Sequence, residues 1–333
     1  MALSKIEFSR DSTWQHGARR PSSPADFDWP GRHGGGRGQR IAEPQRRARL
    51  AHPGELGEGL GELTLRFEPD QGSLWCGFAH HERPCFTQAL LRDIATLQER
   101  VERAHADWAG PRLRAVVWHS QLPGIWNLGG DLSLFLRLIR NGEREALRAY
   151  AYACVGTIHS NLTKLELPVL TLALSQGDAL GGGFEAALTN DVIIAERQSK
   201  FGLPEILFGM FPGMGAYNLL CRRISGAAAR SLIQSGRLHD ADELAAMGLV
   251  DQVVDTGAGP AAVREYLDRQ ARRHKVLTTL SRVERLCQPV HYDTLIEITD
   301  LWVETAMELE EADLRRMERL ASAQDRRRVR AAA

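Results

Sequence analysis

Apolar and polar positions follow two different periods along most of the chain. Residues 63–67 and 74–78 alternate apolar and polar side chains around Asp70-Gln-Gly72, which predicts a β-hairpin. Apolar residues at steps of three and four predict a helix over 86–106. Further on, short apolar runs predict buried strands at 115–118, 167–175, 192–195 and 249–254. Helices are predicted between them at 132–139, 144–162, 184–189, 227–236 and 241–247. This alternation predicts parallel βαβ units and therefore an α/β fold.

The two ends of the chain differ from this middle. Residues 1–58 lack apolar periodicity and contain Gly34-Gly-Gly-Arg-Gly38, so we expect a disordered, mildly basic extension. It is either without function or a contact for an acidic protein or nucleic acid. An α/β core is predicted over 59–255 and a helical region over 256–333, where one apolar stripe runs through Leu295, Ile298, Trp302, Ala306 and Leu309. The arginines at 326–330 are predicted to be a solvated end.

The composition is that of an ordinary globular protein. The 42 Lys and Arg residues balance 42 Asp and Glu residues, so charge gives no argument for a nucleic-acid or membrane partner. No apolar run reaches the length of a membrane span, and no secretory leader is visible at the N-terminus. The five cysteines are odd in number and lack CxxC spacing, which favours reduced thiols over disulfides or a zinc site. We therefore expect a cytoplasmic protein without a metal.

Two glycine turns carry the candidate chemistry. Gly181 to Gly183 follow an apolar strand and open a helix, and Gly129-Gly130 repeat this arrangement earlier in the chain. Glycine allows a close approach to the backbone, and a helix N-terminus offers unpaired N–H donors, so such a turn suits an anion or a developing oxyanion. Glu185 falls in the first turn of the second helix, and Glu205 lies among glycines and prolines that restrict its backbone. Each is either a surface carboxylate or a catalytic acid or base.

Five segments in this order and at this spacing resemble the crotonase superfamily, the enoyl-CoA hydratases and isomerases. They are Trp126-Asn-Leu-Gly-Gly-Asp131, Gly177-Asp-Ala-Leu-Gly-Gly-Gly-Phe-Glu185, Gly202-Leu-Pro-Glu205, Phe211-Pro-Gly-Met-Gly215 and Ala246-Met-Gly-Leu-Val250. The similarity runs from about residue 60 to the C-terminus. It implies a crotonase fold, in which a spiral of ββα units precedes a helical trimerisation region. The expected assembly is a homotrimer or a hexamer of stacked trimers.

A narrower resemblance is to the diffusible signal factor synthases, bacterial enzymes that make cis-2-unsaturated fatty acids as quorum-sensing signals. The segments that carry it are 127–135, 179–188, 202–208, 211–217 and 302–307. Trp126 stands where that group usually has Phe, and the extension over 1–58 is not part of its pattern. By this resemblance the chain dehydrates a 3-hydroxyacyl group on acyl carrier protein to the cis-2-enoyl form and then hydrolyses the thioester.

The resemblance also implies residue roles. Gly130 and Gly182 would supply the two oxyanion-hole N–H groups, and Glu185 and Glu205 would be the acid/base pair, with the assignment of acid and base left open. The presence of both carboxylates favours hydration, dehydration or thioester hydrolysis over isomerisation. Met214, Trp302 and Leu180 are candidates for the acyl pocket, or else plain core residues. The histidines at 80, 81, 119 and 159 lack metal-ligand spacing and are interpreted as structural.

Two other functions remain open. One is a conventional enoyl-CoA hydratase of fatty acid metabolism, and the other is a regulatory protein that binds a sensor kinase. Neither enzymatic function needs a cofactor beyond the acyl carrier protein or CoA that carries the substrate.

Overall fold

The computed structural model describes residues 53–106 and 112–331. The extension predicted over 1–58 therefore lies almost entirely outside the described residues. Its last part is the 3₁₀ helix η1 (Pro53–Gly57), whose Leu56 is buried in the core. Within the described ranges, no helix is long and apolar enough to cross a membrane.

The larger sheet has six strands in the order β1-β2-β3-β5-β7-β10. Their bounds are Leu63–Glu68, Ser73–Phe78, Ala115–Ser120, Leu170–Ser175, Val192–Glu196 and Gln252–Val254. The edge strand β1 is antiparallel to β2, with Leu63 opposite Phe78, which confirms the predicted hairpin. Every other pair in this sheet is parallel.

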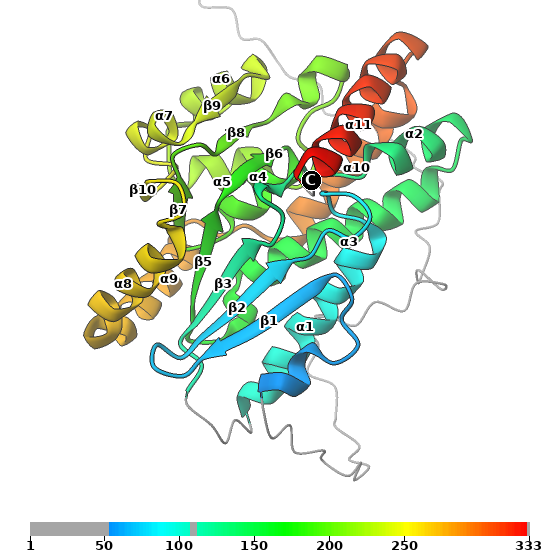
Figure 1. The fold of residues 1–333 in the computed structure, drawn as a ribbon. Helices are drawn as coiled ribbons and strands as arrows, with labels where there is room; N and C mark the ends of the chain where they lie inside the picture. Colours follow the sequence, from blue (N-terminus) through cyan, green and yellow to red (C-terminus); the bar gives the residue numbers. More distant parts are fainter. Residues whose placement is uncertain (1–52, 107–111, 332–333) are drawn as a thin grey trace, which may run out of the picture.

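The smaller sheet has the order β4-β6-β8-β9; Figure 1 labels β6, β8 and β9. Its strands are Gly124–Asn127, Gly177–Leu180, Lys200–Gly202 and Leu238–Asp240. The chain passes from β3 to β4, from β5 to β6 and from β7 to β8, and each time it moves from the larger sheet to the smaller one and then into helices. This repeated passage is a spiral of ββα units and confirms the expected fold class.

Both faces of the larger sheet are covered by helices. Alternate residues of β3 enter different apolar clusters. Val116 and Trp118 pack on the side covered by α1 (Gln88–Ala106), while Ala115 and Val117 pack on the side covered by α8 (Gly259–Gln270). Strands that are buried on both faces have continuous apolar runs, which explains why these strands were visible in the sequence. The helices in chain order are α1 (Gln88–Ala106), α2 (Leu132–Arg140), α3 (Arg144–Leu162), η2 (Lys164–Glu166), α4 (Gly182–Leu188), η3 (Pro204–Phe208), α5 (Ala216–Cys221), α6 (Gly226–Ser235), α7 (Ala241–Ala246), α8 (Gly259–Gln270), η4 (Ala271–Arg273), α9 (His274–Cys287), α10 (Tyr292–Met307) and α11 (Glu311–Ala331).

The C-terminal region is helical, as predicted, but it does not simply extend into solvent. Helix α10 packs against α3, and α11 turns back to lie beside α2 and η3, close to the smaller sheet (Figure 1). The prediction of a solvated end is wrong for Arg327, which is partly buried and forms an ion pair of 2.6 Å with Asp178. The C-terminal helix therefore contacts the strand that leads into the triple-glycine turn.

Candidate active site

The two glycine turns lie against each other because their strands are neighbours. Strand β4 pairs with β6, and each strand leads directly into its turn. A side chain at Gly129, which has a φ of +88°, would place its Cβ 2.9 Å from the backbone nitrogen of Gly182. Only glycine allows this approach, so the sequence requirement at these positions follows from contact between the turns.

The Gly130 N–H is left without a hydrogen-bond partner in the described part of the chain. The amides around it are all engaged: Leu128 N donates to Pro84 O at 2.7 Å, Gly129 N to Asn127 Oδ1 at 2.8 Å, and Asp131 N to the Tyr150 hydroxyl at 3.1 Å. The Gly182 N–H opens α4, where no intrahelical partner exists. Both predicted oxyanion donors are therefore free to bind a ligand.

Glu185 is fixed by the backbone of a later segment. Its side chain is 1% exposed, and its Oε1 accepts hydrogen bonds from Met214 N and Ala216 N, each at 2.9 Å. Burial raises the pKa of Glu185 to about 7, although the two N–H donors favour the charged form. The carboxylate is thus held in one orientation and can exchange a proton near neutral pH.

Glu205 lies in the first turn of η3 and lacks comparable support. The residue as a whole is partly exposed, but its Oε2 is sealed from solvent and has no hydrogen-bond partner in the described part of the chain. Burial and the negative charge of Glu185 raise the pKa of Glu205 to about 8. Its Oε1 lies 2.7 Å from the position that a Cβ on Gly181 would take. An orphaned buried oxygen of this kind suits a carboxyl group that holds a proton and awaits a substrate.

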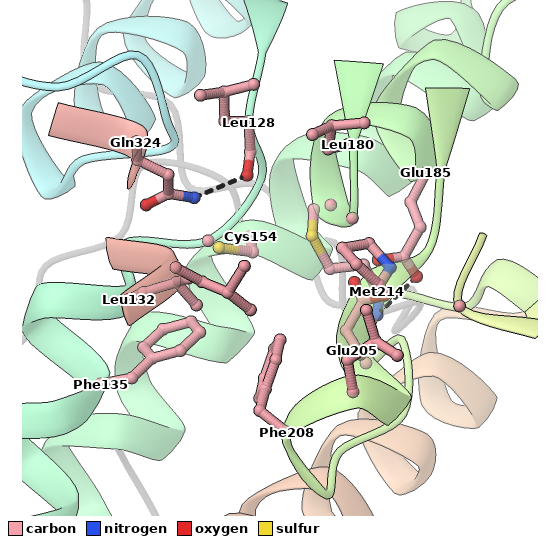
Figure 2. A pocket seen from close by; sticks show the side chains of 18 of the residues that line it. Leu128, Leu132, Phe135, Cys154, Leu180, Glu185, Glu205, Phe208, Met214 and Gln324 are labelled. Atoms are coloured by element: carbon pink, nitrogen blue, oxygen red, sulfur yellow. Dashed lines mark hydrogen bonds between the residues drawn. The ribbon is translucent and has the colours of Figure 1, made fainter. Parts of the chain in front are cut away.

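All seven predicted site residues line one cavity of about 270 Å³. They are Gly130, Leu180, Gly182, Glu185, Glu205, Met214 and Trp302. Figure 2 shows Glu185 and Glu205 on the same side of this cavity, next to Met214. The structure therefore brings together residues that lie far apart in the sequence, from Gly130 to Trp302.

Other walls of the cavity were not predicted. Phe135 makes edge-to-face contacts with Trp302 and Tyr150, with ring centroids 5.0 and 5.3 Å apart, and these three rings form an aromatic wall. Phe208 lies opposite Phe135 in the cavity (Figure 2). In the sequence these residues belong to ordinary apolar helical stripes, and nothing there separates a cavity wall from core.

Cys154, Gln324 and Arg327 also line the cavity and were not predicted as site residues. Burial raises the pKa of the Cys154 thiol to about 12, so it stays neutral and serves as an apolar wall. Gln324 donates from Nε2 to the carbonyl oxygen of Leu128 at 2.9 Å (Figure 2). Across the described ranges, no group of three or more His, Cys, Asp or Glu side chains is arranged to hold a metal ion.

Comparison with known proteins agrees with this geometry. A family model described as enoyl-CoA hydratase/isomerase matches residues 86–278, more than half of the chain. The chain belongs to the enoyl-CoA hydratase/isomerase family. The match covers both glycine turns and both carboxylates and ends within α9.

Curated relatives in this family are similar over part of their length. The mitochondrial methylglutaconyl-CoA hydratase of Mus musculus is 35% identical over 160 residues, which are 47% of this chain and 48% of that protein. The probable enoyl-CoA hydratase 2, mitochondrial, of Arabidopsis thaliana is 32% identical over 179 residues, 53% of this chain and 56% of that protein. The chain thus spans about half the length of the curated relatives it matches.

Solved structures share the fold at low sequence identity. Pseudomonas aeruginosa DspI superposes with a TM-score of 0.59 at 22% identity, over 80% of this chain and 96% of that one. The enoyl-CoA hydratase from Bacillus halodurans gives a TM-score of 0.65 at 19% identity, over 78% and 100%. Human mitochondrial delta3-delta2-enoyl-CoA isomerase superposes with a TM-score of 0.65 at 17% identity, over 80% of this chain and 98% of that one. Because the neighbours include a hydratase and an isomerase, this likeness speaks to the fold and not to the reaction.

Proposed function

We propose that this chain adds water to, or removes it from, the Cα–Cβ bond of an acyl thioester. The observation that carries the proposal is the pair Glu185 and Glu205, both with a pKa raised to near neutrality, in a cavity that also receives two free N–H donors. Reversible addition of water needs one group that gives a proton and one that accepts it. The names of the curated relatives, which are hydratases, support the same reaction class.

The N–H groups of Gly130 and Gly182 would bind the thioester carbonyl oxygen. When a proton leaves or joins Cα, this oxygen carries the charge of an enolate, and two fixed donors stabilise that charge more than the ground-state carbonyl. The apolar cavity around them excludes water and strengthens the interaction.

The environments of the two carboxylates suggest their roles. In hydration, Glu205 would hold the proton and deliver it to Cα, while ionised Glu185 would take a proton from the water that attacks Cβ. The proton then resides on Glu185 after one turnover, and dehydration is the same sequence reversed. Two N–H donors favour the ionised state of Glu185, and the orphaned Oε2 and the neighbouring charge favour a proton on Glu205.

The first experiment follows loss of the enoyl absorbance of trans-2-enoyl-CoA substrates on addition of the purified protein. We expect Glu185→Gln and Glu205→Gln each to lower kcat/KM by about 10²–10⁴, the usual contribution of a positioned acid or base. The control is Glu304→Gln, an exposed carboxylate on α10 outside the cavity. The proposal is wrong if the parent neither hydrates enoyl thioesters nor dehydrates 3-hydroxyacyl thioesters on CoA or acyl carrier protein.

Within this class we propose a signal synthase that dehydrates 3-hydroxyacyl-acyl carrier protein to the cis-2-enoyl thioester and then releases the free acid. Support comes from the motif similarity and from the aromatic wall of Phe135, Tyr150 and Trp302, which suits a long apolar chain. The same carboxylates could direct water to the thioester carbon, with the carbonyl oxygen still in the oxyanion site.

Mass spectrometry of the products distinguishes the proposed signal synthase from a conventional enoyl-CoA hydratase. Incubation with 3-hydroxyacyl-acyl carrier protein should yield a free cis-2-enoic acid, and culture extracts should lose this acid when the gene is deleted. The names of the curated relatives favour the second candidate, a conventional enoyl-CoA hydratase. Rapid hydration of enoyl-CoA without any free cis-2 acid would select that second candidate.

We also propose that the chain self-associates through α9. Four large apolar side chains lie along one side of this helix: Val276 is 67% exposed, Leu280 50%, Val283 45% and Leu286 73%. Steps of four, three and three residues place them on one stripe. A contiguous apolar stripe of this kind is typical of an interaction surface, and a second copy of the chain is the occupant expected from the family resemblance.

A further inference from the structure

The C-terminal helix holds both glycine turns through two side chains that are one helical turn apart. Gln324 donates from Nε2 to the Leu128 carbonyl oxygen at 2.9 Å, and Leu128 immediately precedes Gly129-Gly130. Arg327 pairs through Nη1 with Asp178 Oδ2 at 2.6 Å, and Asp178 lies in β6, three residues before Gly181. Residues at i and i+3 share one face of a helix, so this face of α11 contacts both segments.

We propose that Gln324 and Arg327 are positioning residues that set the distance and orientation between the Gly130 and Gly182 N–H groups. The inference rests on the proposed function, because it concerns the donors of that same site. Neither side chain needs to touch the reacting atoms for this role.

Strand pairing and the close glycine contacts bring the two turns together, but the strand ladder is irregular where the first turn begins. The pairing of β4 with β6 shifts register between Ile125 and Asn127, just before the first turn begins. A register shift interrupts the regular hydrogen bonds that would otherwise align the strand ends. Helix α11 spans the two strand ends beyond this irregularity and therefore supplies a constraint that the sheet does not.

The local contacts of the first turn show where α11 acts. Asn127 and Tyr150 already bind the amides of Gly129 and Asp131, so the N–H side of the turn is held from within the core. The Leu128 carbonyl accepts its side-chain hydrogen bond from Gln324 alone in the described part of the chain. The Leu128–Gly129 peptide is thus held at its N–H end by Asn127 and at its carbonyl end by Gln324, and loss of Gln324 would remove the second of these two constraints.

The contact of Arg327 with Asp178 also argues against a primary role in substrate binding. Asp178 is largely buried, with 15% of its side chain exposed, and it also accepts a hydrogen bond from Lys200 N. Binding of Arg327 to a substrate phosphate would leave this carboxylate buried without its charged partner, which is unfavourable. The geometry therefore favours a fixed structural contact at the cavity wall.

The experiment compares Gln324→Leu and Arg327→Met with the parent by steady-state kinetics on the thioester substrate. We expect kcat to fall roughly 10- to 100-fold with KM little changed, since a small misplacement of an oxyanion donor costs about that much. Arg327→Lys should recover much of the rate because it keeps the charge. The matched control is Glu318→Gln, which removes a contact of α11 with Arg140 on α2, at 3.4 Å, away from the turns.

Hydrogen exchange provides a readout that does not depend on activity. Exchange of the segment 127–131 should rise in Gln324→Leu, and exchange of 177–183 should rise in Arg327→Met, with neither segment altered in Glu318→Gln. The parent's melting temperature should be retained in Gln324→Leu and only modestly lowered in Arg327→Met, which leaves Asp178 without its charged partner. Parent-like kcat and exchange in both variants would overturn the inference, as would a raised KM with unchanged kcat, which would make Arg327 a substrate-binding residue. A parent that is inactive on every thioester would reject the proposed function and this inference with it.

Discussion

At the scale of single residues, the two carboxylates differ in what surrounds them rather than in chemistry. Glu185 receives two backbone N–H groups from the segment after Pro212, whereas the buried Oε2 of Glu205 receives none in the described part of the chain. Burial raises the pKa of both carboxyl groups, and the negative charge of Glu185 raises that of Glu205 further. The pair therefore retains one proton over a pH range in which an exposed glutamate would be ionised.

This difference predicts an unusual dependence of stability on pH. The folded-state pKa values, about 7 for Glu185 and about 8 for Glu205, lie above the ordinary value of 4.5. The folded protein therefore binds more protons than the unfolded chain between these limits, so the contribution of the pair to stability declines as pH rises above about 4.5 and is lost above about 8. Buried His80, whose pKa burial lowers to about 4, acts in the opposite direction but only below its ordinary value of 6.5. We therefore expect the free energy of unfolding in urea to fall between about pH 6.5 and pH 8 in the parent.

The free energy of unfolding should fall less steeply with pH in Glu205→Gln. This variant removes one of the two titrating groups while keeping the shape of the side chain. Lys164, whose pKa burial lowers to about 8, changes stability in the opposite direction and only above that pH, and it is common to both proteins. Equal slopes for the parent and Glu205→Gln would show that Glu205 titrates normally.

The glycines of the triple turn predict two different responses to alanine. A Cβ on Gly182 would lie 2.7 Å from Met214 Sδ, and a methionine side chain can move aside. A Cβ on Gly183 would overlap the backbone carbonyl oxygen of Asn127, which cannot move without displacing β4. We expect Gly183→Ala to destabilise the fold by about 1–3 kcal/mol or more, and Gly182→Ala to cost less stability but most of the activity.

Thermal unfolding and the thioester assay measure the two effects on the same samples. Equal melting temperatures for the two variants would contradict the contacts described for Gly183.

At the scale of elements, the sequence predicted the helices and strands that are long or buried enough to have a regular apolar period. The long helices α1 and α3 and the buried strands β3, β5 and β7 fall close to their expected ranges, because burial imposes an apolar period on them. The short strands β6, β8 and β9 were not predicted, since three or four residues rich in glycine or polar side chains carry no period.

The residues of the candidate site likewise divide into those that the sequence could indicate and those that it could not. Gly130, Gly182, Glu185 and Glu205 were candidates from the sequence, because the glycine turns and the resemblance to the crotonase superfamily single them out, and the structure places all four in one cavity. Phe135, Gln324 and Arg327 could not be predicted, because their roles depend on where α2 and α11 pack, and tertiary packing has no local signature. The tail was misread for this reason: a run of arginines looks solvated until its helix is placed beside Asp178.

Helix α2 offers a prediction at this scale, because Asp131 links the start of this helix to the Gly129-Gly130 turn. Asp131 caps α2 by accepting from Leu134 N at 3.0 Å and pairs with Arg83 at 2.8 Å. Asp131→Ala removes the cap and leaves Arg83 without this partner, so we expect a loss of about 1–3 kcal/mol in unfolding free energy. Activity should fall as well, because Gly130 precedes this cap directly.

The control for this variant is Ser225→Ala, which removes the cap of α6, where the Ser225 hydroxyl accepts from Ala228 N at 3.3 Å. Ser225 lies outside the cavity, so its loss should lower stability without lowering the activity of the remaining folded protein. Comparable activity losses in both variants would show that Asp131 acts through global stability alone.

At the scale of the whole molecule, the site belongs to no single unit of the spiral. One donor comes from the turn after β4, the other from the turn after β6, and one carboxylate from η3 after β8. Helices α10 and α11 then close the cavity with Trp302 and Gln324. The C-terminal helical region thus contributes to the candidate site, and it is also the region expected to join copies of the chain.

The apolar stripe on α9 belongs to the surface proposed to join copies of the chain and not to the cavity, because none of its four residues lines the cavity. If the stripe joins copies of the chain, two glutamates on it should prevent association, since burying unpaired carboxylates costs more than the apolar contacts contribute. We therefore expect light scattering after size-exclusion chromatography to give an oligomeric mass for the parent and the mass of one chain for Leu280→Glu/Leu286→Glu. Leu301→Glu, a similarly exposed leucine on α10, should keep the parent's mass. A monomeric parent, or a double variant of unchanged mass, would exclude α9 as the interface, and the stripe would then need another partner.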